Sequence, residues 1–146
     1  MAPGTYIVNG GTVDLHGNTT LNGTGVTLVL TSSTGTSYPS VDIAGTVNLN
    51  LSAPTSGTFN NILIYEDRNA PSSTTVKIAG NTTSNLQGLI YVPSADLTLT
   101  GVSTTGSNSC LRAIAGSITV NGTSDTTSGP GCTAPQSPLA MTALVE

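Results

Sequence analysis

A four-residue phrase recurs in this chain and constrains its fold more than any other sequence feature. The copies end in glycines that are 35, 35 and 36 residues apart, at Gly10, Gly45, Gly80 and Gly116. The four copies are Ile7-Val8-Asn9-Gly10, Asp42-Ile43-Ala44-Gly45, Lys77-Ile78-Ala79-Gly80 and Ala113-Ile114-Ala115-Gly116. A repeat of this length is typical of solenoids and propellers, in which each repeat buries its apolar face against the next.

The aligned positions predict which side chains stack. The β-branched residues Val8, Ile43, Ile78 and Ile114 share one position, and we expect them to form one buried column. The preceding position places Asp42 and Lys77 as outward-facing neighbours of opposite charge.

The composition indicates an all-β domain. Of the 146 residues, 36% are hydrophobic and only 7% charged, against roughly a quarter charged in a typical domain. Short stretches in which apolar residues alternate with Thr, Ser or Asn predict strands, and Asn-Gly pairs mark their ends. Such strands fit a parallel β-solenoid with short rungs or an antiparallel β-sandwich with hairpin turns; the repeat favours the solenoid. We assign residues 1–134 to this domain and 135–146 to a C-terminal capping strand or tail.

Charge and motifs exclude several classes of function. A net charge of −4 with three basic residues does not suit a nucleic-acid partner. No run approaches the roughly 18 apolar residues of a membrane-spanning helix. Gly10-Gly11 lacks the lysine and the following helix of a phosphate loop, and His16 is the single histidine, so neither a cofactor nor a metal is predicted.

The two cysteines, Cys110 and Cys132, flank a polar stretch. We predict a disulfide between them, which would remove loop entropy worth about 3 kcal/mol from the unfolded chain. A disulfide implies an oxidising compartment, and therefore the periplasm, the cell envelope or the exterior.

One charged cluster, Glu66-Asp67-Arg68, follows the apolar strand Ile62–Tyr65. The cluster could bind a ligand through its carboxylates and guanidinium. Alternatively, Asp67 organises a turn by accepting backbone N–H groups, while Arg68 lies over Tyr65 or Tyr91 or pairs with a carboxylate. We expect the organising role, and name these three residues as the candidate binding site.

Two further functions have partial support in the sequence. Parallel β-helices include enzymes that act on polysaccharides, and a glycosidase needs two carboxyl groups roughly 5–10 Å apart. The carboxylates available are Asp14, Asp42, Glu66, Asp67, Asp96, Asp125 and Glu146. The alternation at Thr98 and Thr100 suggests an ice-binding ladder, but Asp, Lys or Asn stands at the corresponding positions of the other repeats.

Several motifs resemble the C-terminal region of TadG-like proteins, which are associated with Flp/Tad pilus assembly in bacteria. They are the opening Pro3-Gly4-Thr5-Tyr6, the Tyr65-Glu66-Asp67-Arg68 turn, the Gly88-Leu89-Ile90-Tyr91-Val92-Pro93 strand and the ending Leu144-Val145-Glu146. The resemblance covers nearly the whole chain and implies an extracytoplasmic domain of a protein anchored by an N-terminal membrane helix.

These observations together predict a non-catalytic extracellular structural or interaction module, involved in pilus assembly or surface adhesion. Its expected partner is a protein or a surface glycan. The alternatives are a carbohydrate-active β-helix enzyme or polysaccharide-binding module, and an ice-binding protein.

Overall fold

The computed structural model describes residues 1–80, 84–101 and 110–122. These residues form nine strands and no helix, which confirms the all-β prediction, and none of them supplies a helix that could span a membrane. The strands are β1 (Gly4–Asn9), β2 (Thr12–Leu15), β3 (Thr20–Thr24), β4 (Val26–Thr31), β5 (Ser40–Ser52), β6 (Ile62–Glu66), β7 (Thr75–Gly80), β8 (Asn85–Thr100) and β9 (Leu111–Asn121).

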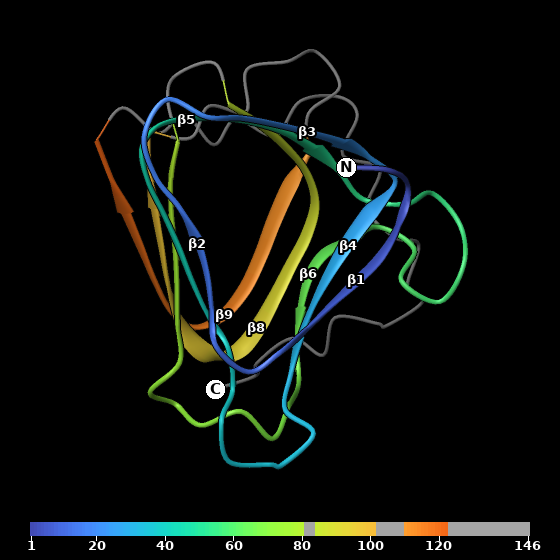
Figure 1. Ribbon diagram of the computed structural model, residues 1–146, viewed down its shortest axis with the longest axis vertical. Helices are drawn as coiled ribbons and strands as arrows, with labels where there is room; N and C mark the ends of the chain where they lie inside the picture. The colour runs from blue at the N-terminus through green and yellow to red at the C-terminus, as the bar shows by residue number, and fades with distance from the viewer. Residues whose placement is uncertain (81–83, 102–109, 123–146) are drawn as a thin grey trace, which may run out of the picture.

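The chain winds around three sides of a roughly triangular outline (Figure 1). The first side consists of β1, β4, β6, the middle of β8 (residues 88–92) and the leading part of β9, paired in that order. The second side consists of β2, the first part of β5, β7, and the later parts of β8 and β9. The third side is formed by β3, the end of β5 and the beginning of β8.

All strand pairings among the described residues are parallel. An antiparallel sandwich with hairpins at the Asn-Gly pairs is therefore excluded for this part of the chain. The arrangement is a parallel, nearly closed sheet around an apolar interior, consistent with a β-solenoid.

The turns of this winding differ in length, which the constant repeat did not predict. On the second side, Val13 pairs with Val41, Val41 with Val76, and Val76 with Leu97, so three successive steps along the chain are all unequal. The corner between the first two sides explains much of the difference. It takes residues 32–39 after β4 and 67–74 after β6, whereas β8 passes it within one strand.

The predicted isoleucine column is consequently correct only in its middle. Ile43 pairs with Ile78, and both side chains are buried. Val8 instead pairs with Leu30 on the first side, and Ile114 pairs with Tyr91 and is half exposed. Unequal corner loops separate positions that a constant period aligns. The predicted neighbours Asp42 and Lys77 are register partners.

Inward side chains fill the interior with aliphatic residues. Alternate residues of each strand point inward, so the inward positions of successive rungs stack. The fully buried members include Leu30, Val41, Val47, Leu49, Val76, Leu86, Ile90, Val92 and Leu97. This continuous core fixes which strand residues face outward, and those outward residues determine what the protein can contact.

Candidate functional site

One outward column on the first side is apolar along its whole length. Register pairs connect its members in sequence, and we call it the outer apolar column: Ile7, Val29, Tyr65, Tyr91 and Ile114. The neighbouring Leu30, Ile64 and Ile90 are buried, so strand alternation turns the column outward. Ile7 is 68% exposed and Ile114 50% exposed, at its two ends. Four rung spacings make the column about 19 Å long.

Aromatic rings concentrate at the centre of this column. Tyr65 and Tyr91 stack with centroids 5.5 Å apart and planes 16° apart, because they occupy adjacent rungs. Phe59 packs against Tyr65 at 5.8 Å with its ring tilted by 58°. The guanidinium carbon of Arg68 lies 5.7 Å from the Tyr91 centroid, within the range of a cation–π contact. The column therefore carries a cation beside its central aromatic pair.

Asp67 holds the turn that presents Arg68. Its Oδ1 accepts hydrogen bonds from the backbone N–H of Asn69 at 3.0 Å and from the Asn69 amide at 3.1 Å. Its Oδ2 accepts one from the Thr31 hydroxyl at 2.9 Å. The Asn69 N–H and the Thr31 hydroxyl favour the charged carboxylate and lower the pKa of Asp67 below its ordinary value. The predicted contacts of Asp67 and Arg68 are confirmed.

Glu66 departs from the prediction because its side chain points into the protein. It is 1% exposed and occupies the inward position paired with Leu30. Its Oε1 accepts a hydrogen bond from the Thr74 hydroxyl at 2.6 Å, and its Oε2 accepts one from the backbone N–H of Ser94 at 3.1 Å. Glu66 thus ties the corner after β6 to the next rung. The three charged residues do not converge on one ligand, since Glu66 lies inside, Asp67 is occupied by the turn and Arg68 covers Tyr91.

Cys110 lies immediately before β9 and is disulfide-bonded. Its backbone carbonyl accepts a hydrogen bond from the N–H of Gly88, one rung earlier. The predicted partner, Cys132, lies outside the described residues, so the pairing itself stays a prediction.

A charged outward column occupies the second side. Asp14, Asp42 and Lys77 are register partners in that order, followed by Thr98 and Thr119. The His16 imidazole contacts the carboxylate of Asp14 at 2.5 Å, and both side chains are more than half exposed. The Thr column is interrupted by charged residues, as the sequence indicated. No group of three or more His, Cys, Asp or Glu side chains in the described ranges is arranged to hold a metal ion.

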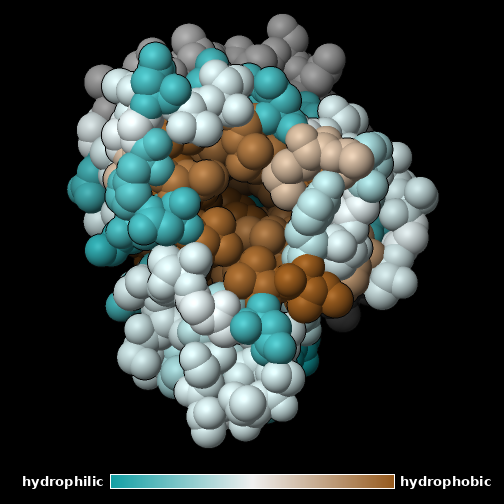
Figure 2. Space-filling model, viewed as in Figure 1, coloured by the Kyte–Doolittle hydropathy of each residue, from teal (hydrophilic) through white to brown (hydrophobic). Residues whose placement is uncertain are grey.

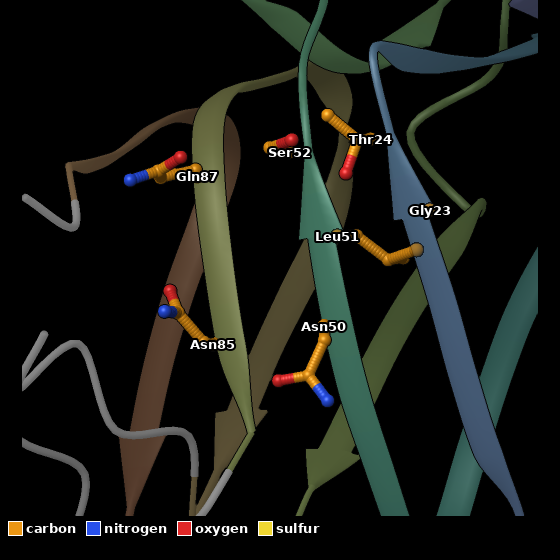
Figure 3. A pocket seen from close by; sticks show the side chains of 7 residues that line it. All are labelled: Gly23, Thr24, Asn50, Leu51, Ser52, Asn85 and Gln87. Carbon is orange, nitrogen blue, oxygen red and sulfur yellow. The ribbon is translucent and has the colours of Figure 1, made fainter. Parts of the chain in front are cut away.

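A shallow groove of about 180 Å³ lies on the third side, and sequence reasoning did not find it. It is lined by Gly23, Thr24, Asn50, Leu51, Ser52, Asn85 and Gln87 (Figure 3). Asn22, Asn50 and Asn85 are register partners, and the side-chain amide of Asn50 donates a hydrogen bond to the side-chain Oδ1 of Asn22 at 3.0 Å. The groove carries amide and hydroxyl groups and no charged residue.

The end of the sheet at β1–β3 opens onto the apolar interior. Figure 2 shows apolar side chains around a hollow in this end of the molecule. The cavity measures about 90 Å³ and is lined mainly by aliphatic side chains, including Val13, Leu15 and Leu21 of the first turn. This opening has no polar group suited to chemistry on a ligand.

In comparisons with known proteins, no protein-family model, curated protein or solved structure matches this chain.

Proposed function

We propose that this chain is a non-catalytic extracytoplasmic interaction module that contacts a protein partner through the outer apolar column. The observation that carries the proposal is the unbroken line of apolar residues facing solvent on the first side. The corresponding outward columns of the other sides contain Asp, Lys, Thr and Asn. Exposed apolar residues that form a continuous patch mark an interaction surface more often than scattered ones.

The dimensions of the column favour an extended segment as partner. The column is about 19 Å long and one side chain wide. Its surface area is therefore far smaller than the roughly 800 Å² that each partner buries in a standard interface between folded proteins. An extended chain covers this length with about six residues. Apolar side chains of that segment would pack along Ile7, Tyr91 and Ile114, and a carboxylate would meet the guanidinium of Arg68.

The extracytoplasmic placement is supported by the chemistry of Cys110. Disulfides persist in oxidising compartments and are rare in the cytosol, and Cys110 is disulfide-bonded. The resemblance to TadG-like proteins supplies the narrower proposal that the partner belongs to a bacterial pilus or to its assembly apparatus. In this proposal the fold is a parallel β-solenoid, whose stacked rungs hold the column straight.

Binding of a neutral polysaccharide is a second candidate function. It is favoured by the uncharged groove on the third side, because amide and hydroxyl side chains match the hydrogen-bonding groups of sugars. Aromatic residues do not line this groove, and the aromatic pair of the first side belongs to a different surface. For this reason the protein partner is our principal proposal.

Binding to bacterial envelopes tests the principal proposal. The labelled protein would be incubated with envelope fractions from a strain that assembles Tad-type pili and from the same strain with the pilus genes deleted. The variant Ile7→Ser with Ile114→Ser removes the exposed ends of the column, and Thr98→Ala with Thr119→Ala alters the second side as a control. We expect pilus-dependent binding that the first variant loses and the control retains. Equal binding by both variants would refute the column as the contact surface.

The same preparations separate the second candidate. Affinity electrophoresis in gels containing a neutral soluble polysaccharide would report retardation by the groove. Retardation of the wild type that Asn50→Ala abolishes, and that Ile7→Ser with Ile114→Ser leaves unchanged, would replace the protein partner with a glycan.

A further inference from the structure

The last described rung leaves its inward side uncovered. On the second side, Ile118 pairs with Leu97 and Val120 pairs with Leu99. Leu97 and Leu99 are 0% and 3% exposed, whereas Ile118 and Val120 are 50% and 48% exposed. Two buried aliphatic columns therefore end at β9 in large apolar side chains that the described residues do not cover.

The register predicts which residues continue these columns. Leu97 follows its register partner Val76 by the same number of residues as Ile118 follows Leu97, and we call this number the step. The parallel steps from Ile78 to Leu99 and from Leu99 to Val120 have the same length again. One further step of that length reaches Leu139 and Met141, which are both apolar.

The outward residues of the second side are separated along the chain by the same step. The series Lys77, Thr98 and Thr119 continues to Ala140, and the series Ala79, Thr100 and Asn121 continues to Thr142. Pro138 falls on the position that follows Thr75, Asp96 and Ser117, the beginning of the rung, where a strand tolerates proline. Residues 138–142 thus have the alternation of a rung whose inward residues are large and apolar.

The cysteine spacing agrees with one additional turn. Cys132 follows Cys110 at nearly the same interval at which Leu111 follows Gly88, its register partner on the first side. Adjacent rungs are about 4.7–4.9 Å apart, within the roughly 4.4–6.8 Å between Cα atoms that a disulfide requires. A Cys110–Cys132 bond would therefore join nearly the same position of two successive turns.

We propose that the uncovered end of β9 is a docking surface for the chain's own C-terminal segment, residues 138–142. Leu139 packs on Ile118 and Met141 packs on Val120, which extends the two aliphatic columns by one rung. Docking of this segment also pairs the edge of β9 that no described strand covers, an edge that would otherwise be open to strands of other chains. This inference is independent of the outer apolar column.

Site-directed cross-linking tests the register directly. The variant Thr119→Cys with Ala140→Cys places thiols on outward neighbours of adjacent rungs. The control Thr119→Cys with Met141→Cys places them on opposite faces. After mild oxidation, unreduced peptides of the monomer fraction would be mapped by mass spectrometry. We expect the 119–140 cross-link and little 119–141 cross-link; equal yields of the two, or neither, would overturn the register.

Two further results complete the test. Cross-links between two chains in place of intramolecular ones would show that a second copy supplies the segment, and would overturn docking within one chain. Hydrogen exchange provides a measurement without added cysteines. Leu139→Asp with Met141→Asp should accelerate amide exchange in residues 117–121 and leave β6 and β7 unchanged, whereas unchanged exchange throughout would contradict the proposal.

Discussion

Replacing Ile78 by alanine tests the stacking of inward side chains. Ile78 is 2% exposed and lies between its register partners Ile43 and Leu99, both of which are buried. The substitution removes three buried carbons, worth about 2.4 kcal/mol at roughly 0.8 kcal/mol for each. The rungs above and below restrict collapse into the space, so a cavity term adds to this loss. We expect the free energy of unfolding to fall by about 3–4 kcal/mol.

Ile114→Ala is the matched control, because the sequence repeat aligns Ile114 with Ile78 whereas the structure separates them. Ile114 faces outward and is half exposed. The same three carbons then contribute about half of their transfer free energy, and their removal encloses no cavity. The expected loss is about 1.2 kcal/mol.

Urea unfolding followed by circular dichroism would measure both variants, with the slope of the transition checked against the wild type. A constant slope shows that the change in midpoint reflects stability alone. Losses of equal size at the two positions would refute the assignment of Ile78 to the interior and Ile114 to the outer apolar column.

Three other predictions concern the turn after β6 and the disulfide. Glu66→Ala should cost about 1–3 kcal/mol of unfolding free energy, because it leaves the partly buried Ser94 N–H without its acceptor; no loss in urea unfolding would contradict the inward position of Glu66. Asp67→Asn should destabilise the protein at neutral pH and have a decreasing effect as the pH falls below about 4. The folded-state pKa of Asp67 is lowered, so its contribution is present above the unfolded-state pKa and disappears as the carboxylate is protonated; a difference that persists at low pH would argue against this cause. A thiol assay on denatured, unreduced protein should find no free thiol, whereas two reactive thiols would refute the Cys110–Cys132 disulfide.

Local sequence patterns predicted the strands well, because each alternating stretch is short and bounded by glycine or a polar loop. The interpretation of Ile62–Tyr65 as a strand is confirmed in β6. The Asp67 turn was also predictable. An aspartate carboxylate commonly accepts the backbone N–H two residues further along the chain, here that of Asn69, and Pro71 cannot donate a hydrogen bond to a strand ladder. The strand pattern and the hydrogen bonds between Asp67 and Asn69 depend on interactions within a few residues.

The pairing between turns was much less predictable, because it depends on the corner loops. The outer apolar column has unequal steps, since the stretch of chain from Val29 to Tyr65 is much longer than the stretch from Ile7 to Val29. No fixed period aligns such positions. The inward orientation of Glu66 was missed for a related reason, since its acceptor role requires Ser94, which lies on the next turn. A search allowing corner loops of variable length could have aligned the strands that contain Tyr65 and Tyr91.

Successive turns of the chain stack in the register that builds the outer apolar column. Nuclear Overhauser contacts between selectively labelled Tyr, Ile and Val side chains measure this register most directly. Side chains on adjacent rungs are about 4.8 Å apart at their backbones, and those two rungs apart are about 10 Å apart. We predict contacts of Ile7 with Val29, of Tyr65 with Tyr91 and of Tyr91 with Ile114. Contacts of Val8 with Ile43 and of Ile78 with Ile114 in their place would show that this register is wrong.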